Sequence, residues 1–307
     1  MPDLETFLVE LYVLADEFCK EQPPVPRPGP AAALWPSEAL TLAIVSQWAR
    51  FQSERDFYRF ATQHLRPYFP RLPSRPQFNR LLRRHQDALT RFALWLAARL
   101  GATTTPYEVL DGTAIPTRNA KRRGRGWLAG LADIGKCLRR GWIHGLRVLV
   151  CAAPDGPVTG WGTGPASTND RALAETLFAV RRRPQARLPS AGHPASSAYV
   201  ADTGFAGTAC EAHWVETYWA QVVAPPQDIA KWAWSVGDRR WLAGLRQVVE
   251  SVIDRLLSPF RLEHERPHTL EGFQTRLAAK MALHNVCIWL NRQHGHPDLA
   301  LAHLPGW

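Results

Sequence analysis

The sequence predicts an α/β fold, a mixed sheet flanked by helices, with a helical region before it and a helical tail after it. Apolar stretches at 107–111 and 199–202 are strand-like, and each ends in a carboxylate. Between them, 146–153 and 157–164 form an apolar pair separated by a Pro-Asp-Gly turn, which is typical of a β-hairpin. Strands that alternate with helices are typical of an α/β layer.

Residues 1–104 are expected to be helical. A proline-rich run at 23–30 interrupts regular structure. Ser74 and Gln77 have the spacing of a capping box, which predicts a long helix from there toward Leu100. The start of this helix is rich in arginine, and a solvated face and contact with DNA are both open explanations. These arginines are Arg75, Arg80, Arg83 and Arg84.

A second helical region is expected from Arg239. Its apolar residues follow the i, i+3, i+4, i+7 spacing of a single buried stripe. The stripe consists of Leu242, Leu245, Val249, Val252, Ile253 and Leu256. Pro259 ends this helix, and a last helix is expected from Leu270 to Leu290, with Phe273, Leu277 and Met281 facing inward.

The overall charge favours a polyanionic partner. Lys and Arg outnumber Asp and Glu by 37 to 27, which gives a formal net charge of +10. Phosphates attract such dispersed cations at long range, although a role in solubility alone is the alternative.

The five cysteines are scattered, with no Cys-x-x-Cys pair, which is typical of a reducing compartment rather than a disulfide framework or a zinc module. No stretch approaches the length of a membrane-spanning helix, and no signal pattern opens the chain. A cytoplasmic protein without a membrane partner is expected.

Three acidic residues are the candidate site. Asp111 and Asp202 each close an apolar strand, and Glu250 lies beside the apolar stripe of the late helix. Neighbouring strands are about 4.8 Å apart, so two such carboxylates can converge and a helix across the sheet can supply a third. Carboxylate clusters bind hard divalent cations, and two ions about 3.5–4 Å apart support phosphoryl transfer. For each acid alone, a turn or cap role is the alternative.

Other acids are assigned different roles. Glu108 is three residues from Asp111, so it is expected on the opposite face of the strand. Asp254 is an alternative to Glu250 as the third acid. The acids expected in turns or caps are Asp133, Asp155 and Asp170.

A basic run follows Asp111. It consists of Arg118, Lys121, Arg122, Arg123 and Arg125. An exposed loop is one explanation, but its place directly after a candidate acid favours contact with a DNA backbone.

The segments around the three acids resemble the DDE transposases of bacterial insertion sequences. These segments are YEVLDGTAIPTRNAKRRGRG (107–126), YVADTGFAG (199–207) and RRWLAGLRQVVESVIDRL (239–256). The group concerned carries Tyr-x2-Arg-x3-Glu-x6-Lys in its third segment, and Arg246 stands at the family's distance before Glu250. The likeness runs through most of the chain from Ser37 to Asn291, and it favours Glu250 over Asp254.

The resemblance implies a ribonuclease H-like catalytic core at 105–262. A helical N-terminal region at 1–104 and a helical tail at 263–307 packed on the core are expected beside it, and recognition of DNA ends is assigned by exclusion to the N-terminal region, within 37–100. Asp111 would be the acid on the first strand and Asp202 that on the fourth, with Glu250 on a late helix.

The implied reaction is cleavage of a strand at the end of an insertion sequence, followed by attack of the freed 3′-hydroxyl on target DNA. Asp111, Asp202 and Glu250 would hold two Mg²⁺ ions, with Mn²⁺ as a substitute. Arg246 and the basic run would hold the DNA, and the chain would act as a homodimer on it.

The sequence departs from this family at two positions. Ala243 stands where the pattern has tyrosine, and Leu257 stands where it has the lysine. These departures leave two alternatives open: a transposase-derived DNA-binding protein that no longer cuts, and a metal-dependent nuclease without strand transfer.

Overall fold

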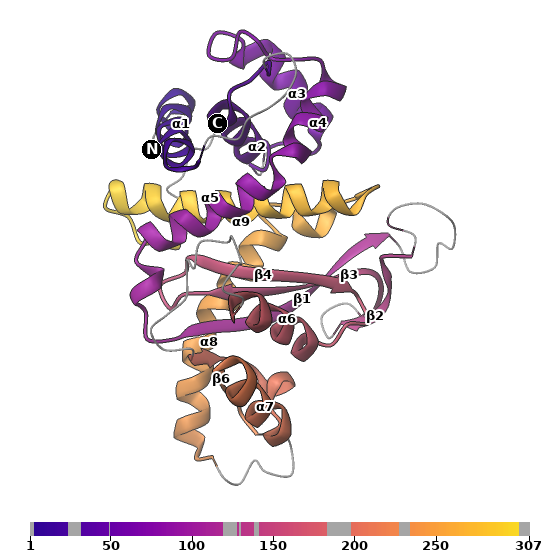
Figure 1. The fold of residues 1–307 in the computed structure, drawn as a ribbon, viewed down its shortest axis with the longest axis vertical. Helices are drawn as coiled ribbons and strands as arrows, with labels where there is room; N and C mark the ends of the chain where they lie inside the picture. Colours follow the sequence, from indigo (N-terminus) through magenta and orange to yellow (C-terminus); the bar gives the residue numbers. More distant parts are fainter. Residues whose placement is uncertain are drawn as a thin grey trace. The chain divides into compact units, whose positions relative to one another are not determined.

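The chain divides into two compact units. The computed structural model describes residues 3–23, 32–48, 50–118, 128, 130–137, 141–182, 198–226 and 234–300. One unit comprises Met1–Trp95 with Glu271–Trp307, and the other comprises Leu96–Leu270 (Figure 1). The boundaries predicted at 104 and 262 stay predictions. In the described ranges, no helix combines the length and the apolar character needed to span a bilayer.

The first unit is built from helices around an aromatic core. Its helices are α1 (Leu4–Glu21), α2 (Pro36–Val45), α3 (Glu54–Phe60), α4 (Arg75–Arg84), α5 (Gln86–Arg99, whose last turn belongs to the second unit) and α9 (Leu270–Gln293). Phe18 and Phe92 pack edge to face with ring centroids 5.5 Å apart, a favourable aromatic geometry. The residues predicted to face inward from α9, Phe273, Leu277 and Met281, are fully buried.

The capping box at Ser74 and Gln77 is confirmed, but the long helix predicted after it is wrong. Gln77 accepts a hydrogen bond from the backbone N–H of Ser74 at 3.3 Å, and α4 begins at the next residue. His85 leaves the helical region with φ −96° and ψ 10°, so the segment divides into α4 and α5. Because this break carries neither glycine nor proline, the sequence gives no signal for it.

The second unit contains a six-stranded mixed sheet, which confirms the predicted α/β class. Its strands are β1 (Glu108–Arg118), β2 (Asp133–Cys137), β3 (Gly141–Ala152), β4 (Val158–Pro165), β5 (Ala198–Val200) and β6 (Gln221–Val223). β3 is antiparallel to β1, and β2 and β4 pair with successive parts of its other edge. On the far side of β1, β5 and β6 are parallel to it. The predicted β3–β4 hairpin is confirmed, whereas β2 was not predicted.

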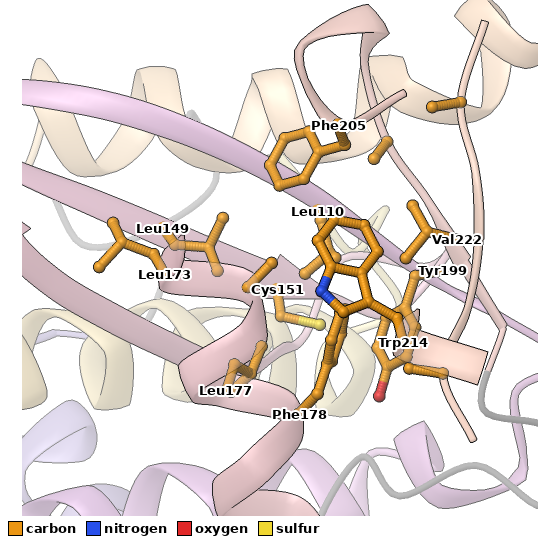
Figure 2. Packing of buried hydrophobic residues seen from close by; sticks show 14 of the residues in the cluster. Leu110, Leu149, Cys151, Leu173, Leu177, Phe178, Tyr199, Phe205, Trp214 and Val222 are labelled. Carbon is orange, nitrogen blue, oxygen red and sulfur yellow. The ribbon is translucent and has the colours of Figure 1, made fainter. Parts of the chain in front are cut away.

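Two helices, α6 (Asp170–Arg182) and α7 (Thr208–Tyr218), cover an apolar cluster on one face of the sheet. Figure 2 shows Leu110 and Cys151 from the strands beside Phe178 of α6 and Trp214 of α7. The rings of Phe178 and Trp214 meet edge to face at 5.5 Å. α8 (Val236–Leu257) contacts β1, β3 and β5. Its predicted apolar stripe is buried at Leu242, Val249, Val252, Ile253 and Leu256, whereas Leu245 is only half-buried.

A buried ion pair fixes β1 to α6. Glu108 is fully buried, and its carboxylate accepts hydrogen bonds from both terminal nitrogens of Arg181. The same guanidinium donates to the Tyr199 hydroxyl at 2.9 Å and to the Thr159 carbonyl at 3.1 Å, which ties β4 and β5 to the helix. Glu108 therefore faces α6, as predicted from its spacing to Asp111.

We expect Glu108→Leu to lower the free energy of unfolding by about 3–5 kcal/mol, because it leaves the Arg181 charge buried and unpaired. The double variant Glu108→Leu, Arg181→Met removes both charges and should recover most of this loss. Equilibrium denaturation of the two variants measures the difference. A double variant as unstable as the single one would contradict the account.

Candidate active site

Asp111 lies on β1, and Asp202 follows the end of the neighbouring parallel strand β5. The register pairs Val109 of β1 with Val200 of β5, and each aspartate comes two residues after its member of this pair. Adjacent strands are about 4.8 Å apart, and the charge of Asp202 acts on the Asp111 carboxyl, so the two residues belong to one region of the structure. Asp111 does not close its strand as predicted, because β1 continues to Arg118 along β3.

Asp202 is held by the turn that follows it. It caps the short 3-10 helix Thr203–Phe205, and its Oδ1 accepts a hydrogen bond from the backbone N–H of Gly204 at 2.8 Å. A carboxylate is a favourable cap because it satisfies a backbone donor that the first turn leaves free. The cap fixes one oxygen of Asp202, while the side chain stays partly accessible.

Arg246 of α8 lies between Asp111 and Glu250. Its Nη2 is 3.9 Å from Asp111 Oδ2 and 3.4 Å from Glu250 Oε1. Glu250 is on the exposed side of α8, with 54% of its side-chain surface accessible. The structure thus brings Asp111 and Asp202 together and connects Glu250 to them through Arg246. Within the described residues, no three Asp, Glu, His or Cys side chains are already arranged to hold a metal ion.

Burial raises the pKa of Asp111 to about 6, because the charged carboxylate loses water there. The Arg246 guanidinium and the backbone N–H of Gly112, 2.8 Å from Asp111 Oδ1, partly offset this rise. The negative charges of Asp202 and Asp170 raise the pKa of Asp111 further. Desolvation and the neighbouring negative charges therefore both disfavour the ionised form of Asp111.

A comparison with models of protein families shows to which family the chain belongs. The model of the transposase DDE domain matches residues 108–286, more than half of the chain, and this span includes all three acids. The chain belongs to this family. No curated protein and no solved structure matches it. Membership of the DDE transposase family indicates a transposase function in general terms and implies a nuclease or transposase activity.

Asp170, the first residue of α6, stabilises β1 next to Asp111. Asp170 and Arg147 of β3 form a two-point ion pair, with Arg147 Nε 2.6 Å from Asp170 Oδ1. The Asp170 carboxylate lies directly over Gly112, where an added Cβ would be 2.2 Å from Oδ1. Only glycine fits beside Asp111 without displacing this pair. Asp170 was predicted to be a turn or cap residue, and its partner on a distant strand was not foreseen.

Arg171, the next residue of α6, stabilises the turn that follows Asp202. Arg171 donates from Nε to the carbonyl of Gly204 at 2.9 Å and from Nη2 to the carbonyl of Ala206. It thereby fixes the turn that caps Asp202. Consecutive residues of one helix thus hold the segments that follow both aspartates. Sequence reasoning missed Arg171, because its partners are carbonyl groups that carry no residue signature.

The remaining predicted residues fall into two groups. Leu257, at the family's lysine position, is buried with 6% of its surface exposed, so it serves packing. Arg118 ends β1, but its side chain lies outside the described residues, as do Lys121, Arg122, Arg123 and Arg125. Contact between this run and DNA stays a prediction.

We expect Asp111→Asn to stabilise the chain near pH 8 in the absence of divalent cations. The pKa of Asp111 is about 6 in the folded chain and lies near 3.8 without burial. The folded state therefore binds the proton more tightly, and this group makes stability fall as pH rises from about 4 to about 6. A shift of two units corresponds to about 3 kcal/mol at most.

Denaturant titrations across this pH range test the expectation, with Asp254→Asn as a control on α8. The profile of Asp111→Asn should lack the fall that the unaltered chain shows between about pH 4 and pH 6. Profiles that run parallel would contradict the assignment.

We expect Arg171→Ala to loosen the turn after Asp202. The amide of Phe205, which is bonded to the Asp202 carbonyl at 3.0 Å, should exchange with solvent faster by about tenfold. Hydrogen–deuterium exchange measures this. Glu175→Gln is the matched control, because Glu175 lies one turn later on α6 and binds His213 and Tyr218 of α7 instead. Equal exchange at Phe205 in both variants would remove Arg171 from this role.

Proposed function

We propose that this chain is a DNA transposase that cleaves a strand at the end of an insertion sequence and transfers the freed 3′-hydroxyl to target DNA. Asp111, Asp202 and Glu250 are its three catalytic acids. The observation that carries the proposal is the parallel register that sets Asp111 beside Asp202. It occurs within a span that matches the transposase DDE domain.

The order of the strands supports a ribonuclease H-like core. Three antiparallel strands, β4, β3 and β1, are followed across the sheet by β5 and β6, which run parallel to β1. The first acid is then on the central strand β1, and the second follows its parallel neighbour. This is the arrangement that the family resemblance implies for the first two acids.

The donor chemistry of the site fits divalent cations. Carboxylate oxygens are the ligands that Mg²⁺ and Mn²⁺ prefer, and the crowding of negative charge at Asp111 would be relieved by a bound cation. Asp111 and Asp202 would hold two such ions, with Glu250 as the third ligand. Bound there, the ions would lower the pKa of the attacking water or hydroxyl and would neutralise the charge that develops on the leaving oxygen.

Arg246 is the residue proposed to hold the scissile phosphate. Its Nε is buried and has no hydrogen-bond partner among the described residues, although its Nη2 lies near two carboxylates. A buried donor without a partner costs about 1–3 kcal/mol, so a movement of the side chain that brings Nε to a phosphate oxygen would be favourable. When Arg246 turns toward phosphate, Glu250 is released to approach Asp111. The basic run at 118–125 would neutralise the adjoining backbone, and two copies of the chain would hold the two DNA ends.

A second candidate function is that of a DNA-binding protein of the same origin that no longer cuts. The burial of Leu257 favours it, because the family's lysine is replaced by a side chain that packs in the interior. In this alternative, the chain binds DNA tightly and produces no metal-dependent strand breaks. A nuclease without strand transfer would instead give linear products and no joined species.

We expect Glu250→Gln to lower strand cleavage by about 100-fold or more, because it removes a charged metal ligand. The substrate is a duplex from the border of the gene, incubated with Mg²⁺ or Mn²⁺. Asp254→Asn is the matched control, since it removes one carboxylate one turn further along α8 and should keep cleavage within about twofold.

Asp202→Asn should behave like Glu250→Gln in the same assay. If the unaltered chain and Asp202→Asn cleave equally, Asp202 has no part in the mechanism. If Asp254→Asn is inactive while Glu250→Gln is active, the third acid is Asp254.

A further inference from the structure

Positive charge is concentrated in one segment of the helical unit. Residues 50–84 contain nine arginines and no lysine, against two acids, Glu54 and Asp56. The segment therefore carries a net charge of +7, whereas the whole chain carries +10. It comprises α3, a short π-helical segment at Ala61–Leu65, α4 and the turns around them.

Both acids of the segment are already engaged. Glu54 binds Arg276 of α9 at 2.6 Å and accepts a hydrogen bond from Asn79 at 2.9 Å. Asp56 accepts a hydrogen bond from the backbone N–H of Gln52 at 3.1 Å. Glu54 is therefore paired with a cation outside the segment, and no salt bridge joins Asp56 to an arginine among the described residues.

The exposed arginines of α4 have no acidic partner within the described ranges. These are Arg75, Arg80 and Arg84. Arg83 has only a long contact, 3.8 Å, with Glu271. Arg80 and Arg84 lie one turn apart on the same side of the helix, and like charges at this spacing cost a few tenths of a kcal/mol. An anion bound across both would remove that cost.

The geometry of α4 suits a DNA groove. Its capping box fixes where the helix starts, and Phe78, Leu81 and Leu82 are buried on its inner side. The helix has ten residues and is therefore about 15 Å long, and a major groove about 12 Å wide admits one helix. Its outer side carries no large exposed apolar residue, so an anionic membrane surface is a poorer match than a duplex.

We propose that α4 is the element of this chain that reads duplex DNA, with Arg80 and Arg84 directed into the major groove. Arg55 and Arg59, which are exposed on α3, contact the neighbouring phosphates. Arginine fits this role because its guanidinium bonds to guanine O6 and N7 together, and to phosphate in the same two-point manner. The inference rests on the proposed transposase function only in taking the duplex to be an element end.

The test is binding by the full chain in EDTA, so that no cleavage occurs. A pool of duplexes with a randomised centre is passed over the unaltered protein, and an enriched duplex becomes the probe for fluorescence anisotropy. Arg80→Ala and Arg84→Ala are compared with Lys20→Ala, which removes one exposed helical cation that is paired with Asp16 in the same unit. Thermal unfolding shows that each variant is folded.

Arg80→Ala and Arg84→Ala should each weaken binding to the enriched duplex by about tenfold or more, while Lys20→Ala binds like the unaltered chain. Arg80→Lys separates the two kinds of contact. It should restore a phosphate contact and the salt dependence of binding, but it should not restore preference for the enriched sequence.

If both alanine variants bind the enriched duplex as tightly as Lys20→Ala, the proposal is overturned. If only the salt slope changes, by about one for each variant, and the sequence preference is kept, α4 contacts phosphates and does not read bases. That result also overturns the proposal. Either failure leaves the proposed cleavage untouched, since the dependence of cleavage on Asp202 is measured separately. Conversely, reading by α4 without any cleavage would refute the proposed activity alone.

Discussion

The charge of Asp111 is the constraint on which the second unit depends. A half-buried carboxylate on a central strand is unfavourable, and the negative charge of Asp202 makes it more so. One guanidinium, that of Arg246, partly compensates for it from α8. Such a site is costly in a chain selected only for stability, and perturbed carboxyl groups of this kind are typical of functional sites.

The face of β1 opposite Asp111 is held firmly by ion pairs and by packing against α6. Glu108 is locked to Arg181, Gly112 lies under the Asp170–Arg147 pair, and Leu110 packs into the cluster shown in Figure 2. Side chains alternate along a strand, so every residue that anchors β1 on α6 leaves its neighbour free to face α8. The other side of the strand is thus fixed by ion pairs and packing, which compensates for the unfavourable desolvation of the Asp111 carboxylate.

The sequence predicted those parts whose signal is local. The apolar stripe of α8, the β3–β4 hairpin and the capping box of α4 each depend on residues within a few positions, and all three agree with the structure. The parallel pairing of β1 with β5 joins residues about 90 positions apart, and the sequence offered it only as a hypothesis, that the strands before Asp111 and Asp202 are neighbours. The roles of Asp170 and Arg171 depend on partners that no local pattern names. Likewise, β2 forms where β3 offers an open edge, so its existence depends on tertiary structure.

The distribution of charge along the sequence separates the positive segments of the chain from the three acids of the candidate site. Asp111, Asp202 and Glu250 against the single guanidinium of Arg246 give the candidate site a negative charge, which repels a phosphate backbone. Leu257 stands where the signature that this chain resembles has a lysine, so this position adds no cation. Attraction must then come from elsewhere, and residues 50–84 carry +7 while the basic run at 118–125 adds five further cations. Together these two segments exceed the net charge of the whole chain, so the remainder is slightly acidic. On the proposed function, a polyanion would first be attracted by the cations of these two segments, and the acidic site would accept its phosphate only after bound cations had neutralised the carboxylates.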